Sequence, residues 1–118
     1  MSRNPQEMVM AMQNLFAVFD LRMKEAGIDY IVTCTKRTQE EQDALYAQGR
    51  TKPGAIVTWT RKSKHIEGKA FDIAIMKNSK VSWDAADYAD AGRIGEDVDL
   101  EWGGSWKKPD RPHFQLKE

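Results

Sequence analysis

Apolar residues recur at helical spacing near the start of the chain. The stripe consists of Met8, Met12, Leu15, Phe16, Phe19 and Met23. Steps of three and four residues place such side chains on one face of an amphipathic helix. Asn4 and Pro5 have the residue types of an N-cap and a first helical position, and Gly27 is a suitable end. We expect the methionines to lie in the core, because flexible thioethers most often fill irregular gaps there.

A period of two residues marks a strand at residues 71–76. One face carries Asp72, Ala74 and Met76, and the other carries Phe71, Ile73 and Ile75. Residues 30–35 are rich in β-branched side chains and predict an earlier strand. Residues 100–102 and 113–116 are short strand candidates. These segments predict a sheet with one apolar face.

A second helix is expected to begin at a capping box, Thr38-Gln39-Glu40-Glu41, and to run to about Gln48. Residues 50–62 follow as a long loop, which could contain a short strand at 56–58. Loops of this length in a compact domain are often functional. Trp59 in this loop either offers a stacking surface to a substrate or anchors the loop to the core.

A third helix is expected to open at Trp83 or Asp84, with an inner side formed by Tyr88, Ala91, Ile94 and Val98. Gly92 and Gly95 weaken this prediction. The order helix, strand, helix, loop, strand, helix, strand, strand predicts a small α+β domain with helices packed on one face of a mostly antiparallel sheet. The other face is expected to carry the site. We expect residues 1–118 to form this single domain.

Composition narrows the possible functions. The formal net charge is zero, so the charge balance gives no argument for a nucleic-acid partner. The single cysteine, Cys34, excludes an internal disulfide, and its apolar surroundings predict a buried, inert thiol. No run approaches transmembrane length, and the first residues lack the pattern of a signal peptide. We therefore expect synthesis in the cytoplasm and no membrane insertion.

The two histidines are the strongest candidates for chemistry. His65 lies in Ser63-Lys64-His65-Ile66-Glu67-Gly68-Lys69-Ala70-Phe71-Asp72, and His113 lies in Asp110-Arg111-Pro112-His113-Phe114. Two imidazoles and the Asp72 carboxylate would suffice for a catalytic zinc site, which takes three protein ligands and leaves a position for water. The spacing alone leaves another interpretation open, in which His65 is a surface residue and Asp72 pairs with a lysine.

The residue patterns of these motifs resemble those of a known family. Ser-x-His-x-x-Gly-x-Ala-x-Asp, then Glu-Trp-Gly-Gly-x-Trp and Asp-x-Pro-His-Phe, are similar to motifs of the zinc D,D-peptidase and L-alanyl-D-glutamate peptidase superfamily. Within it, the chain resembles single-domain phage endolysins that cut peptidoglycan stem peptides. Residues 33–38 and 40–51 are also similar to that family. The resemblance covers roughly residues 30 to 116.

This resemblance implies that His65, Asp72 and His113 are zinc ligands and that Asp110 is the catalytic base. Pro112 favours an extended or polyproline conformation before it, which would turn Asp110 and His113 to the same side. The alternative for Asp110 is a turn aspartate paired with Arg111 or Lys108. Glu101 is the rival base, although its place in the Glu-Trp-Gly-Gly segment makes it resemble a supporting residue.

The resemblance also implies a role for Arg37, which would bind the substrate carbonyl and the developing oxyanion. Otherwise, Arg37 would form a surface salt bridge to Glu40 or Glu41. The family usually has an aromatic residue or glycine before this arginine, whereas this chain has Lys36. Ser63 and Gln42 are candidates for substrate binding, and Ser63 could instead support a ligand histidine. Arg50 and Trp106 are weaker candidates.

Together these features predict a monomeric zinc metallopeptidase that cuts peptidoglycan stem peptides between L-alanine and D-glutamate. Without a signal peptide, such an enzyme would reach the cell wall only after release by another factor. A D-alanyl-D-alanine carboxypeptidase or dipeptidase is the alternative within enzymes. A non-catalytic, zinc-stabilised binding domain is the alternative outside them.

Overall fold

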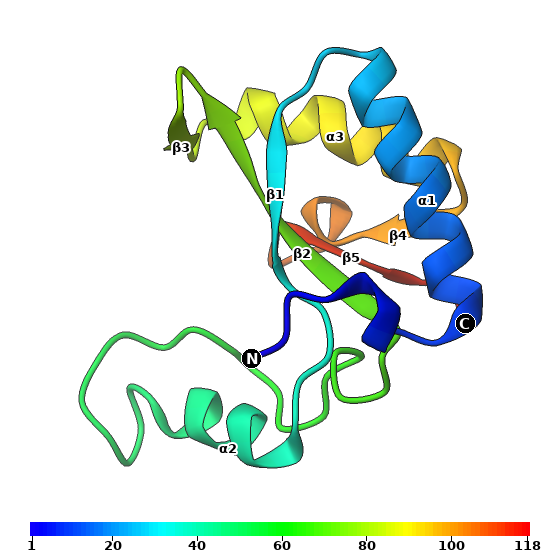
Figure 1. The fold of residues 1–118 in the computed structure, drawn as a ribbon. Coiled ribbons are helices and arrows are strands. Elements are labelled where there is room, and N and C mark those ends of the chain that lie inside the picture. The colour runs from blue at the N-terminus through cyan, green and yellow to red at the C-terminus, as the bar shows by residue number, and fades with distance from the viewer.

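Strand β2 (Ala70–Lys77) is the centre of the sheet in the computed structural model, which describes residues 1–118. It pairs antiparallel with β1 (Tyr30–Cys34), β3 (Lys80–Ser82) and β5 (His113–Leu116). Strand β4 (Leu100–Trp102) pairs antiparallel with β5. The strand order is therefore β1-β2-β5-β4, with β3 attached to β2 (Figure 1).

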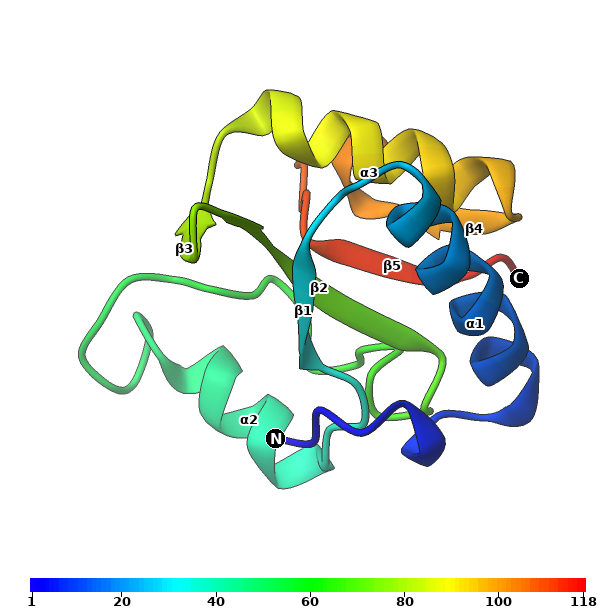
Figure 2. The ribbon, with the colours of Figure 1, turned by 45° about the horizontal axis from the view of Figure 1, so that its top comes forward.

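Helices α1 (Met10–Glu25) and α3 (Ala85–Asp97) lie together over one side of this sheet (Figure 2). Helix α2 (Gln39–Ala47) lies apart from them, close to the long loop that follows it. The predicted α+β fold with a mostly antiparallel sheet is confirmed. No helix combines the length and the apolar character that crossing a membrane requires.

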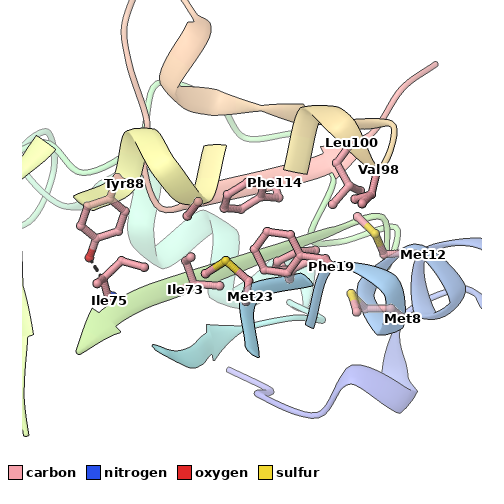
Figure 3. Close-up of a cluster of buried hydrophobic side chains, with 12 residues drawn as sticks. Met8, Met12, Phe19, Met23, Ile73, Ile75, Tyr88, Val98, Leu100 and Phe114 are labelled. Atoms are coloured by element: carbon pink, nitrogen blue, oxygen red, sulfur yellow. Dashed lines mark hydrogen bonds between the residues drawn. The ribbon is translucent and has the colours of Figure 1, made fainter. Parts of the chain in front are cut away.

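The apolar core lies between the sheet and helices α1 and α3 (Figure 3). Its twelve residues are Met8, Met12, Phe19, Met23, Phe71, Ile73, Ile75, Tyr88, Ala91, Val98, Leu100 and Phe114. The ring centroid of Phe19 lies 5.2 Å from that of Phe71 and 4.9 Å from that of Phe114. Each fully buried large side chain contributes roughly 1.5–3 kcal/mol, so this cluster supplies most of the drive to fold. The predicted apolar faces of the first helix and of β2 both belong to it.

Helix α3 forms despite its glycines. A Cβ atom on Gly92 would overlap the ring of Trp102, and one on Gly95 would lie 2.5 Å from the ring of Phe114. Both glycines are therefore points at which the helix approaches large aromatic side chains. The Asp84 side chain accepts a hydrogen bond from the Ala86 N–H at 3.0 Å and caps the helix. What looked unfavourable for the helix in sequence is required by its packing.

The predicted start of the first helix is wrong. Asn4 caps a short 3-10 helix, η1 (Pro5–Glu7), and the α-helix begins only at Met10. Between the two elements, the Val9 N–H donates to the Gly68 carbonyl at 2.9 Å, and this contact draws the backbone out of helical geometry. Gly68 has a φ of +71°, which explains why glycine stands there.

The possible strand at residues 56–58 does not form. Threonine side chains in this loop bond to their own backbone, with Thr60 Oγ1 donating to the Lys62 carbonyl at 2.8 Å. Such local bonds compete with a strand ladder. Strand β3 was not predicted, because three residues after a turn are too short to show a period.

Candidate metal and active site

The two histidines and Asp72 meet on the face of the sheet away from the core. The β2–β5 register places Asp72 directly opposite His113. His65 enters from the turn before β2, where its N–H donates to Ser63 Oγ at 3.1 Å. Asp72 Oδ1 lies 3.1 Å from His65 Nε2 and 3.0 Å from His113 Nδ1. The structure thus brings together the three residues that the resemblance implied as ligands.

Both ring nitrogens of His65 are engaged. Nδ1 lies 2.8 Å from the Thr35 carbonyl oxygen, which can only accept, so Nδ1 carries a proton. Nε2 must then hold a second proton or a cation, because it faces a carboxylate oxygen. Without metal, burial lowers the pKa of His65, but the hydrogen bond and charge of Asp72 outweigh burial and raise this pKa to about 10.

His113 is held in the same manner by a different chain of contacts. Its Nε2 lies 2.8 Å from Gln115 Oε1, and Gln115 Nε2 donates to Glu101 Oε2 at 3.2 Å. The carboxylate fixes the direction of the amide, so His113 Nε2 is the donor to Gln115. The Nδ1 atom of His113 therefore also faces Asp72 Oδ1 with a lone pair, unless a proton or a cation intervenes.

This donor set fits a divalent cation such as zinc. Two imidazole lone pairs and one carboxylate oxygen converge, and the other nitrogen of each ring is fixed by an acceptor, as is usual for metal-bound histidines. Burial raises the pKa of Asp72, but hydrogen bonds from His113 and His65 reverse this effect and lower it, which keeps the carboxylate charged.

Cys34 is a further neighbour that the sequence did not single out as a ligand. With His65 and Asp72 it forms a group able to hold a metal ion. Its Sγ atom, however, lies 3.7 Å from His65 Nδ1, the nitrogen already used by the Thr35 carbonyl. The fixed tautomer therefore favours His113 over Cys34 as the third ligand. Cys34 is buried, as predicted, and Arg37 Nη2 donates to its sulfur at 3.5 Å.

The cluster opens into a cavity of about 1020 Å³. Arg37, Ser63, Asp110 and Trp59 line this cavity together with His65, Asp72 and His113. Among the other candidates from sequence, Trp106 lines it, whereas Gln42, Arg50 and Glu101 do not. Ser63 accepts the backbone N–H of His65, so its observed contact supports the histidine.

Asp110 reaches the cavity through a tight turn. The His113 N–H donates to the Asp110 carbonyl at 3.2 Å, and the Asp110 N–H donates to the Gly103 carbonyl at 2.9 Å. The expected polyproline conformation is absent, because Arg111 and Pro112 form this turn instead. A Cβ atom at Gly103 would collide with the Asp110 carbonyl oxygen and lie 3.2 Å from His113 Cβ, so this close approach requires glycine.

The carboxyl of Asp110 is suited to proton transfer. Asp110 forms no ion pair with Arg111 or Lys108, the pairing that the alternative interpretation of the sequence would require. The side chain is exposed at the cavity rim, yet the surrounding protein removes enough water to raise its pKa, and the charge of Asp72 acts in the same direction. A carboxyl with a raised pKa is a better general base than an ordinary surface aspartate.

Arg37 is buried and held from several sides. Its Nη1 donates to Gln42 Oε1 at 2.6 Å, and its Nη2 lies 3.9 Å from Asp72 Oδ2. Gln42 is fully buried and donates to the Thr60 carbonyl at 2.6 Å. The amide of Gln42 thus connects Arg37 to the long loop, while neither Glu40 nor Glu41 pairs with the arginine.

Glu101 supports the site indirectly, through Trp106 and Gln115, which lie beside His113. Its Oε2 accepts from Trp106 Nε1 at 2.9 Å and from Gln115 Nε2. The Trp106 ring lies 5.2 Å from the His113 ring. Gln115 was missed in the sequence, although it lies two residues after His113 and therefore on the same strand face.

Residues 57–116, just over half of the chain, match a peptidase M15 family model described as D-alanyl-D-alanine carboxypeptidase. This region contains His65, Asp72, Asp110 and His113, whereas Arg37 lies outside it. The predicted family is therefore supported by the region that holds the cluster.

Individual relatives extend the similarity. The chain is 39% identical to the peptidoglycan L-alanyl-D-glutamate endopeptidase CwlK of Bacillus subtilis (strain 168), over 76% of this chain and 62% of that protein. It is 32% identical to the L-alanyl-D-glutamate peptidase of Listeria phage A118, over 76% of this chain and 31% of that protein. This chain thus spans less than two thirds of either relative.

A solved structure agrees with both fold and family. The crystal structure of Serratia marcescens L-Ala D-Glu endopeptidase ChiX superposes with a TM-score of 0.70 and 29% sequence identity, covering 88% of this chain and 78% of that chain. The predicted membership is confirmed: this chain belongs to the M15 peptidase family.

Proposed function

We propose that this protein is a zinc-dependent endopeptidase that hydrolyses the L-alanyl-D-glutamate bond of peptidoglycan stem peptides. The observation that carries the proposal is the convergence of His65, Asp72 and His113 on one side of a cavity that Arg37 and Asp110 also line. The scissile bond is supported by the activities in the names of CwlK, the phage A118 enzyme and ChiX.

Each polar residue has a distinct task in this proposal. His65, Asp72 and His113 would hold zinc, which when bound acidifies water and polarises the substrate carbonyl. The buried guanidinium of Arg37 donates to the carbonyl oxygen as negative charge develops on it. Asp110 accepts a proton from the attacking water and then returns it to the leaving amine.

The surrounding contacts keep these groups in position. The Thr35 carbonyl and Gln115 fix the two histidine rings, and Gln42 fixes Arg37. Pre-orientation of this kind reduces the rearrangement needed as the reaction proceeds. The cavity is also large enough for several residues of an extended peptide.

Residues 1–118 are proposed to act as one catalytic domain. The support is a single apolar core, which contains side chains from Met8, directly after η1, to Phe114 in β5. No second cluster of comparable size is present in the fold.

A digest of purified muropeptides by the zinc-loaded protein, analysed by mass, tests the proposal. Cleavage should produce a new amino group on D-glutamate and a new carboxyl on L-alanine. The family description favours one alternative, D-alanyl-D-alanine carboxypeptidase, which would instead release terminal D-alanine. A zinc-loaded protein that binds muropeptides but releases no fragment would be a binding domain.

A further inference from the structure

The cavity is positively charged although the chain as a whole is neutral. Two carboxylates line it, those of Asp72 and Asp110. The cationic side chains that line it are Arg37, Lys62, Lys64, Lys107 and Lys108. The balanced composition of the chain conceals this asymmetry, since the formal net charge is zero.

Two of these cations already have partners. Arg37 is bound to Gln42 and lies near Asp72. Lys64 Nζ lies 3.5 Å from Glu67 Oε2 and 3.2 Å from Glu118 Oε1. The charge of Lys64 is therefore balanced by these two glutamates, and the guanidinium of Arg37 is held beside the histidine cluster.

Lys62, Lys107 and Lys108 have no acidic partner, and all three are exposed. They lie on two segments of the cavity wall, the long loop before β2 and the segment between β4 and β5. The segments meet where Lys108 Nζ lies 4.1 Å from the ring centroid of Trp59. This cation–π contact holds Lys108 without neutralising it, so the rim presents unpaired positive charge to whatever enters.

The proposed substrate contains a group that such a rim can recognise. Glutamate has two carboxyl groups, and only one of them continues the peptide. The other is either a free carboxylate or an amide. We infer that Lys62, Lys107 and Lys108 select stem peptides with a free glutamate carboxylate over peptides in which that carboxylate is amidated. This inference rests on the proposed function.

The expected effect is moderate and has a characteristic signature. Each exposed lysine–carboxylate pair changes binding by about two- to fivefold, so three of them together change it by about tenfold or more. The contact exists in the ground state as well as the transition state, so KM changes while kcat does not. Since exposed charges are screened, the preference should weaken as ionic strength rises.

Two synthetic stem peptides test this inference, one with the free carboxylate on D-glutamate and the other with a carboxamide there. Steady-state kinetics of the zinc-loaded protein should show a kcat/KM about tenfold or more higher for the free acid, expressed in KM. The triple variant K62Q/K107Q/K108Q should cleave both peptides equally and match the parent on the amide. Raising the salt concentration should reduce the preference of the parent only.

Lys80→Gln is the matched control, because Lys80 is an unpaired lysine on β3 that does not line the cavity. It should retain the full preference, and all variants should melt near the parent temperature. Equal cleavage of both peptides by the parent, or an undiminished preference in the triple variant, would overturn the inference and leave the peptidase proposal standing. If neither peptide is cut, the proposed function itself fails.

Discussion

The two faces of strand β2 differ in what they demand of the chain. Ile73 points into the core, where it is fully buried among apolar side chains of both covering helices and the neighbouring strands. Asp72, one residue earlier, points to the opposite side and contacts both histidines. The core face needs shape and apolar area, whereas the site face needs particular atoms at particular distances.

The two faces are also completed by different kinds of structure. Helices α1 and α3 cover the core face with regular elements whose apolar stripes are visible in sequence. Three irregular segments complete the site face: the turn that contains His65, the segment after β1 that contains Arg37, and the turn that contains Asp110. The helices thus contribute apolar packing alone, whereas the site combines two strand residues, Asp72 and His113, with three residues from irregular segments.

The largest effect is expected from substitution on the site face of β2. Asp72→Asn removes the charge that contacts both histidines and that, in the proposed site, would hold zinc, so zinc binding should be lost and turnover should fall roughly 10⁴-fold. Metal analysis of the purified variant and muropeptide kinetics measure the two effects. A variant with a full equivalent of zinc and normal turnover would contradict the role of Asp72.

Ile73→Ala, one residue further, is the matched variant on the core face. Removing these buried methyl groups should cost about 2–5 kcal/mol of unfolding free energy. Zinc content and turnover should stay near parental values at temperatures where the variant is folded. If Ile73→Ala also lost zinc, the two faces would be energetically coupled rather than separate.

The core face could be predicted from sequence because its signal is local. The alternation in 71–76 and the stripe from Met8 to Met23 each require one side of an element to be apolar. The start of α1 was predicted wrongly, because Asn4 and Pro5 begin a helix of one turn that ends where Val9 bonds to Gly68. The Val9–Gly68 contact joins residues 59 positions apart, so the local helix propensity of the sequence does not indicate it.

The site face could be predicted only in part. Resemblance pointed to His65, Asp72 and His113, and the sheet register explains how two of them meet. The contacts of Gln42, Gln115 and Cys34 were not foreseen, because they depend on the relative placement of distant segments. Gln115 alone had a local signal, its i+2 spacing from His113.

The second expected effect separates the two candidate bases. Asp110→Asn removes basicity but retains the shape of the side chain, so turnover should fall about 10³-fold with zinc content unchanged. Glu101→Gln keeps an acceptor for Trp106 and Gln115, so it should lower turnover less than about tenfold. The reverse order of the two effects would identify Glu101 as the base.

The third effect concerns the support of Arg37. Arg37→Ala should lower turnover about 10²-fold, because a donor to the developing charge is lost. Gln42→Ala should lower turnover about tenfold, and the double variant should be no slower than Arg37→Ala alone, since Gln42 acts through the arginine. Additive losses in this kinetic cycle would instead indicate that Gln42 has an independent role.

The smallest expected effect is a pH dependence of stability that differs between the two forms of the protein. Without metal, the pKa of His65 is raised from 6.5 to about 10 by the Asp72 carboxylate. The stabilisation from this pair is complete below pH 6.5 and is lost as pH rises towards 10. Since the pKa of Asp72 is lowered from 3.8, its contribution is present above pH 3.8 and is lost as pH falls below that value.

The metal-free protein should therefore melt at a lower temperature at pH 9 than at pH 6, by roughly 5 °C for each kcal/mol lost. The melting temperature of the zinc-loaded protein should instead rise from pH 6 to pH 9, because ligand histidines must lose their protons before they bind metal. Calorimetry in chelator and in zinc should show the gap between the two melting temperatures widening over this range. His65→Gln removes the titrating ring, so its metal-free form should melt at nearly the same temperature at both pH values; an equal fall in this variant would assign the effect to groups outside the site.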